Sequence, residues 1–114
     1  MENKYNIKIG DIFHAEFGYN TIMHDFYKVI GLKGAATVIV QELDTFNTSD
    51  DGYGQMGHLR PYFDKFAWHS KPETKVVKIN KWNNRPTIKM SNYKHAYLMT
   101  DKEYDQDWYF DYMD

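Results

Sequence analysis

The sequence contains no cysteine among its 114 residues. A chain without thiols cannot form a disulfide scaffold, use a cysteine nucleophile or bind zinc through thiolates. It also has no apolar run long enough to span a membrane, and its opening stretch, MENKYNIKIG, holds no signal-peptide core. We therefore expect a soluble protein of the cytoplasm.

Known catalytic motifs are also missing. The sequence has no G-x-S-x-G elbow, no phosphate-binding loop and no dinucleotide fingerprint. We expect a protein that is not an enzyme and that needs no cofactor. One alternative is a metal-free nuclease, because such sites have no fixed spacing. Its best candidates are His58, Arg60 and Tyr62, which stand at alternate positions.

Aromatic residues are abundant instead, at 18% of the chain. Phe13, Ala15 and Phe17 alternate with His14 and Glu16, which is the period of a half-buried strand. Aromatic and β-branched runs follow at 25–32 and 36–43, so residues 1–43 predict a three-stranded meander. Its expected core residues are Phe13, Phe17, Tyr27, Val29, Val38 and Val40.

The next segments are harder to assign. Residues 44–57 are rich in turn formers and predict a mobile loop. Residues 59–68 are compatible with a strand broken at Pro61 or with an irregular segment. Residues 75–80 and 87–90 predict a hairpin, and 96–100 predict another short strand.

The C-terminal segment shows two periodicities. Thr100 and Glu103 form a capping-box pattern, and Tyr104, Trp108 and Tyr112 recur at helical spacing. Trp108, Phe110 and Tyr112 also stand at every second position, as on one face of a strand, and we favour the strand. Altogether we expect one mainly β domain over residues 1–114. Its form is a small curved sheet or barrel, Tudor-like or a roll, with at most one short C-terminal helix.

Histidines and carboxylates flank the connection between the first two expected strands. His14, Glu16, His24 and Asp25 are residue types that bind zinc. Their spacing brings at most three of them together, because His24 and Asp25 are neighbours on opposite faces of a strand. We interpret them as an exposed polar face and predict no metal site.

The charges fall into three blocks. Residues 1–59 carry a net charge of −4, residues 60–95 of +7 and residues 96–114 of −5, counting Lys, Arg, Asp and Glu. The blocks predict either a bipolar surface or, if the segments interleave in the fold, mutual neutralisation.

The basic middle block also interleaves cations with aromatic rings. Cations contact phosphates and rings stack on bases in proteins that bind single-stranded nucleic acid. The alternative is that the rings belong to the core, and for Trp68 and Trp82 both interpretations stay open. The candidate nucleic-acid contacts are Arg60, Lys65, Trp68, Lys78, Lys81, Trp82 and Arg85.

The acidic C-terminal block combines carboxylates with aromatic residues of the kind that anchor protein interfaces. Such a surface is complementary to a basic partner. The candidate contacts with a protein partner are Tyr104, Asp105, Asp107, Trp108, Tyr109, Phe110, Asp111 and Tyr112.

The chain resembles a family of small, mostly uncharacterised proteins carried by phages, plasmids and other bacterial mobile elements. The resemblance rests on motifs that span most of the chain, namely Gly10-Asp11-Ile12, Phe17-Gly18-Tyr19, Phe26-Tyr27-x-Val29, Ile88-Lys89-Met90-Ser91, Ala96-Tyr97 and Trp108-Tyr109. Relatives usually have Trp at position 17 and a Gln-Thr-Asn-like run at 21–23, where this chain has Phe17 and Thr-Ile-Met.

This resemblance implies a setting in the cytoplasm of a bacterial host. Small mobile-element proteins often block host defences by binding, including CRISPR effectors and restriction enzymes. The resulting hypothesis is a non-catalytic inhibitor that occludes a host defence protein or nucleoprotein complex through the acidic tail. The alternative is a small β-barrel that binds nucleic acid directly through residues 60–95.

Overall fold

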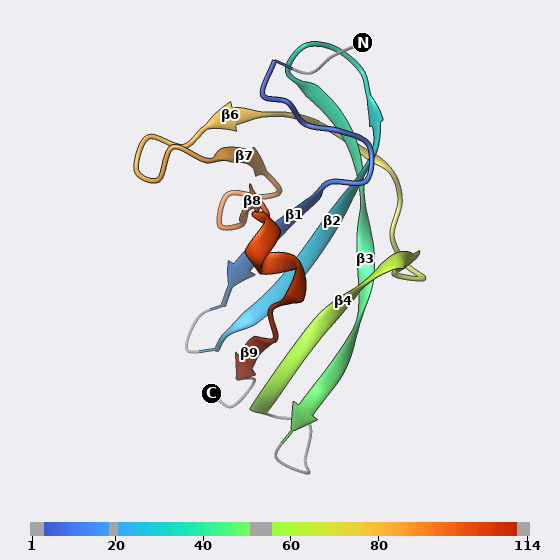
Figure 1. Ribbon diagram of the computed structural model, residues 1–114, viewed down its shortest axis with the longest axis vertical. Coiled ribbons are helices and arrows are strands. Elements are labelled where there is room, and N and C mark those ends of the chain that lie inside the picture. The colour runs from blue at the N-terminus through green and yellow to red at the C-terminus, as the bar shows by residue number, and fades with distance from the viewer. Residues whose placement is uncertain (1–3, 19–20, 51–55, 112–114) are drawn as a thin grey trace.

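Three antiparallel strands form the meander that the alternation predicts, and six shorter or later strands extend it (Figure 1). The computed structural model describes residues 4–18, 21–50 and 56–111. In chain order the elements are β1 (Ile12–Phe17), β2 (Met23–Leu32), β3 (Thr37–Asp50), β4 (Met56–Phe66), β5 (Glu73–Val76), β6 (Lys78–Ile79), β7 (Pro86–Lys89), β8 (His95–Leu98), the 3₁₀ helix η1 (Asp101–Asp105) and β9 (Trp108–Asp111).

The strands make one curled antiparallel sheet that forms a half-barrel. Its order is β6-β7-β8-β1-β2-β3-β4-β9, and β5 pairs with β3. The long strand β3 changes partners along its length. Its first residues pair with β2 and β5, and its last residues pair with β4. The sheet also turns back on itself, since Ile22, just before β2, exchanges backbone hydrogen bonds with Asp111 of β9.

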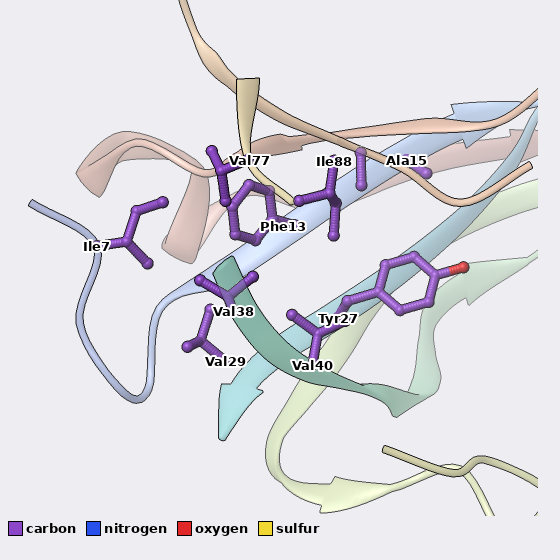
Figure 2. Packing of buried hydrophobic residues seen from close by; sticks show 10 residues of the cluster. Ile7, Phe13, Ala15, Tyr27, Val29, Val38, Val40, Val77 and Ile88 are labelled. Atoms are coloured by element: carbon purple, nitrogen blue, oxygen red, sulfur yellow. The ribbon is translucent and has the colours of Figure 1, made fainter. Parts of the chain in front are cut away.

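The alternation along β1 separates two hydrophobic cores. Phe13 and Ala15 belong to the first core, which β2, β3 and β7 complete (Figure 2). Ile12 belongs to a second core on the opposite face, together with Trp108 and Phe110 of β9. Both faces of the central strands are therefore covered, which the sequence pattern of a half-buried strand does not predict.

The predicted core residues of the meander are confirmed at five positions. Four of the five are fully buried, and Tyr27 is 2% exposed. Phe17 is only partly buried and packs against the edge of the first core. The buried members are Phe13, Tyr27, Val29, Val38 and Val40.

The predicted loop at 44–57 is wrong for the residues that the structure describes there. Residues 44–50 are the second half of β3, and Met56 and Gly57 begin β4. Long-range pairing explains the difference, because residues 45–50 find hydrogen-bonding partners in β4 that a local turn signal cannot anticipate.

Pro61 lies inside β4, which continues to Phe66. A proline removes one ladder hydrogen bond and is tolerated at edges and bulges. Both conditions hold here. The register between β3 and β4 shifts between Leu43 and Thr45, opposite Pro61, and the pairing of β4 with β9 ends at Leu59.

The two periodicities of the C-terminal segment belong to two successive elements. The capping box of Thr100 and Glu103 starts η1, and the alternation at Trp108 and Phe110 is that of β9. The strand that we favoured is therefore confirmed for 108–111. The helix is limited to the short 3₁₀ segment Asp101–Asp105 and does not extend to Trp108.

Candidate functional site

A buried histidine pair joins the first hairpin to the C-terminal strand. His14 of β1 lies 2.7 Å from His24 of β2, measured from Nε2 to Nδ1, and His24 Nε2 lies 2.5 Å from the carbonyl oxygen of Tyr109. A carbonyl oxygen only accepts, so His24 donates from Nε2. A neutral His24 then accepts at Nδ1 the hydrogen bond that His14 donates. The chain of bonds fixes the backbone of β9 against β1 and β2.

The surroundings of the pair are aromatic. The ring of His14 lies 3.8 Å from that of Trp108, measured between centroids, and 4.9 Å from that of Phe26. Burial is the main cause that lowers the pKa of His14 to about 3, and electrostatic interactions with His24 and Arg85 act in the same direction. His14 is therefore neutral at physiological pH.

The interpretation of these histidines as an exposed polar face is wrong. Both are 7% exposed, because β9 crosses the face that the hairpin alone would leave open to water. Glu16 is exposed and Asp25 is bound to Lys94 at 2.8 Å, so neither carboxylate joins the pair. In residues 4–18, 21–50 and 56–111 no group of three or more His, Asp or Glu side chains is arranged to hold a metal ion.

The tail residues divide between core and surface. Trp108 is 8% exposed and Phe110 is 1% exposed, so these two of the predicted partner contacts lie inside the fold and not on its surface. They fill the second core because β9 pairs with β4 and turns alternate side chains inward. Tyr109 points outward, is 40% exposed and contacts the ring of His58. Tyr112 lies outside the described residues.

The acidic residues of the tail surround Arg60 of β4. Its guanidinium lies 3.7 Å from carboxylate oxygens of Asp105 and of Asp107, and it donates a 3.0 Å hydrogen bond to the carbonyl oxygen of Tyr104. The Asp105 side chain is 97% exposed, so its contact with Arg60 is a loose surface pair. Tyr104 is half-buried, and its hydroxyl oxygen accepts a 3.2 Å hydrogen bond from the backbone N–H of Ile12.

Exposed aromatic residues that the sequence reasoning missed continue this surface. Phe46 of β3 contacts Tyr62 of β4, with ring centroids 4.7 Å apart, and Phe63 lies 5.8 Å from the ring of Tyr104. Phe46, Tyr62 and Phe63 line a shallow hollow of about 440 Å³ together with Arg60. The assignment of 44–57 to a loop concealed Phe46, because residues 44–50 contain a single large apolar residue and therefore show no alternation.

We call this surface the β3–β4–β9 face. It combines partly exposed rings with carboxylates that η1 and the segment after it hold around Arg60. Its members are Phe46, His58, Arg60, Tyr62, Phe63, Asp105, Asp107 and Tyr109.

The candidate nucleic-acid residues do not form one surface. Arg60 belongs to the β3–β4–β9 face, and Arg85 is held by Glu103 at 2.7 Å and by the carbonyl oxygen of Leu98 at 2.5 Å. Lys65 lies 3.5 Å from Asp44, and Trp68 stands exposed in the segment between β4 and β5.

Only Lys78, Lys81 and Trp82 come together, on the β6–β7 hairpin. Both expectations about charge are therefore met in part. Three cations of the basic block, Arg60, Arg85 and Lys94, pair with acids of the other two blocks. The lysines of the β6–β7 hairpin form no ion pair among the described residues.

The nuclease alternative rests on His58, Arg60 and Tyr62. His58 Nδ1 lies 3.0 Å from the hydroxyl oxygen of Ser49, and Arg60 is engaged by tail carboxylates. His58 and Arg60 are thus engaged by different neighbours, Ser49 and the tail carboxylates.

The fold and the site together define a class: a small antiparallel half-barrel with an aromatic, carboxylate-bearing outer face. Comparison with models of protein families, with curated proteins and with solved structures found no match. Within the described part of the chain, no helix is long and apolar enough to cross a membrane.

Proposed function

We propose that this protein is a non-catalytic binding protein that meets a protein partner through the β3–β4–β9 face. One observation carries the proposal. Aromatic rings from three strands lie on the same outer surface as the exposed carboxylates of the tail. Partly exposed rings that can be desolvated are the residues that dominate binding energy at protein interfaces.

The chemistry of this face favours a basic partner. Asp105 and Asp107 each lie 3.7 Å from Arg60, a distance at which an exposed ion pair adds little stability. A partner Arg or Lys can therefore take over these carboxylates at low cost. Carboxylates around a ring cluster would compete for a surface that normally binds phosphates.

The resemblance to mobile-element proteins supplies the class of partner that we propose, a host defence protein or nucleoprotein complex. The protein would act by occlusion, because the face offers contact area and charge and its described residues offer no assembled catalytic group. In this proposal Trp108 and Phe110 support the surface from beneath, while Tyr109, Tyr62 and Phe63 contact the partner.

Capture from lysates of bacteria that carry CRISPR or restriction systems tests the proposal. The wild-type chain should retain a host protein, and Tyr109→Ala should weaken that capture by about thirtyfold, as expected for a truncated interface ring. The His24 contact of Tyr109 uses its backbone carbonyl, so this variant keeps the anchor of β9.

Two matched controls accompany it. Trp68→Ala removes an exposed ring outside the face, and Glu16→Lys makes the same charge change as the test variant Asp105→Lys. Both controls should bind as wild type does. Equal loss in test and control variants, or capture that Tyr109→Ala and Asp105→Lys leave intact, would contradict the proposal.

A further inference from the structure

The strands β6, β7 and β8 carry an unusual excess of positive charge. Residues 74–100 contain six Lys or Arg and no Asp or Glu. Three of the six pair with acids from elsewhere, Lys75 with Glu73, Arg85 with Glu103 and Lys94 with Asp25. The remaining three, Lys78, Lys81 and Lys89, are exposed and form no ion pair within the described residues.

Two of these free lysines line an open groove. The groove has a volume of about 410 Å³ and runs over the outer side of β6, β7 and β8. Strand pairing sets its floor, because Lys78 lies opposite Thr87, and Lys89 lies opposite His95. The inward side chains of the same strands, among them Ile88 and Ala96, belong to the first core, so the groove is independent of the β3–β4–β9 face.

An exposed aromatic ring stands beyond each end of β7. Trp82, in the turn from β6 to β7, is 97% exposed, and Tyr93, in the turn from β7 to β8, is 94% exposed. The two turns leave β7 at opposite ends, and a four-residue strand is about 13 Å long. The rings therefore bracket the groove along its length.

The turn that carries Trp82 is ordered by its own side chains. The side-chain oxygen of Asn80 accepts hydrogen bonds from the backbone of Trp82 at 2.8 Å and of Asn83 at 3.2 Å. Asn84 takes a left-handed conformation with φ of 58° and donates to the carbonyl oxygen of Asn80 at 2.8 Å. These bonds fix the backbone of the turn, which presents the side chain of Trp82 to solvent.

From this combination we infer a second binding site, for single-stranded nucleic acid, on the β6–β8 face, which we define by Lys78, Lys81, Trp82, Lys89, Tyr93 and His95. Free lysines beside the groove neutralise backbone phosphates, and the bracketing rings stack on unpaired bases. Duplex bases are already stacked on one another, so rings on two short turns have no base face to meet.

The site differs from the basic segment expected from the sequence. Arg60, Lys65 and Arg85 are excluded because acids engage them, and Trp68 is excluded because it stands on the turn after β4. Lys89, Tyr93 and His95 enter because the hairpin geometry brings them to the same groove or to its end.

Fluorescence anisotropy with a labelled oligothymidine of about twelve nucleotides tests this site, a length within the range that small β-barrels occupy. Three free lysines predict that log K falls with log salt with a slope of about −2, since each phosphate contact on a single strand contributes about −0.7. Raising salt from about 50 mM to about 200 mM should therefore weaken binding about fifteenfold. The matching duplex should bind more weakly than the single strand.

Matched variants locate the site. Trp82→Ala should weaken binding about tenfold, as for the loss of one stacked base, whereas Trp68→Ala removes an equally exposed tryptophan and should leave binding unchanged. Lys89→Gln should weaken binding and reduce the salt slope by about 0.7, whereas Lys33→Gln makes the same charge change on the β2–β3 turn without effect. All four side chains are exposed, and unchanged thermal melting checks that each variant folds.

Four results would overturn the inference. The first is an absence of binding at about 50 mM salt. The second is equal affinity for duplex and single strand, which would assign the cations to non-specific attraction. The third is equal loss in Trp68→Ala and Trp82→Ala, which would show that the bracketing rings have no special role. The fourth is binding of anionic vesicles without binding of the oligonucleotide, which would assign the lysines to a lipid surface.

Discussion

Acidification should destabilise this fold through His14. Burial, with smaller contributions from His24 and Arg85, lowers its pKa to about 3, whereas in the unfolded chain the pKa of His14 is near the ordinary histidine value of 6.5. The unfolded state therefore takes up a proton first as the pH falls. The contribution of His14 is fully present above about pH 6.5 and decreases between there and about pH 3, by about 1.4 kcal/mol per pH unit.

At pH 5 this loss amounts to about 2 kcal/mol, which is a large part of the stability of a small domain. Urea unfolding of the wild type and of His14→Gln at pH 7, 6 and 5 measures it. The free energy of unfolding should fall by about 2 kcal/mol more in the wild type than in the variant between pH 7 and pH 5. The absolute stability of the variant does not enter this comparison.

Comparison with the variant also removes the contribution of other groups. Burial raises the pKa of Glu42, and a raised carboxyl pKa makes the folded state more stable as the pH falls, opposite to His14. Glu42 is present in both proteins, so its effect cancels. Parallel pH profiles for wild type and His14→Gln would refute the placement of a neutral, buried His14 beneath β9.

Three further measurements address the remaining structural claims. Trp108→Ala should lower the free energy of unfolding, measured with urea, by about 3–5 kcal/mol. Trp108→Phe keeps a ring against His14 and should lower it less. An Ala variant as stable as the wild type would contradict the second core. Glu103→Gln should cost about 1–2 kcal/mol in the same assay, because the charge paired with Arg85 is lost, whereas Asp105→Asn should cost nothing measurable. Elemental analysis of tag-free protein should find no stoichiometric zinc, and one zinc per chain that is lost in His24→Ala would prove this wrong.

Local patterns were sufficient for the elements whose partners are close in sequence. The alternation of Phe13, Ala15 and Phe17 predicts β1, and the hairpin with β2 follows because the intervening segment is short. The connection contains Gly18, whose φ of +132° favours glycine, and an added Cβ there would collide with Thr21. The capping box of Thr100 and Glu103 is equally local, and it marks η1 correctly.

Pairings between distant segments could not be predicted in this way. Phe46 of β3 pairs with Arg60 of β4, and the segment around Phe46 is dense in Asp, Ser and Thr, so turn propensity hid a strand. Propensity is a weak signal where the partner strand supplies the hydrogen bonds. The same limit affected charge, because the partner of Lys94 is Asp25 and that of Arg60 is Asp105.

By itself the sequence determined the mainly β class, the first meander and the inward side of each of its strands, because these depend on the period of side chains along one backbone. Only the tertiary structure decided that β9 covers the other side. That covering buries His14 and Trp108 and turns Tyr109 outward. Burial and charge pairing depend on which distant segment packs against a strand. The alternation of side chains within that strand does not identify this segment.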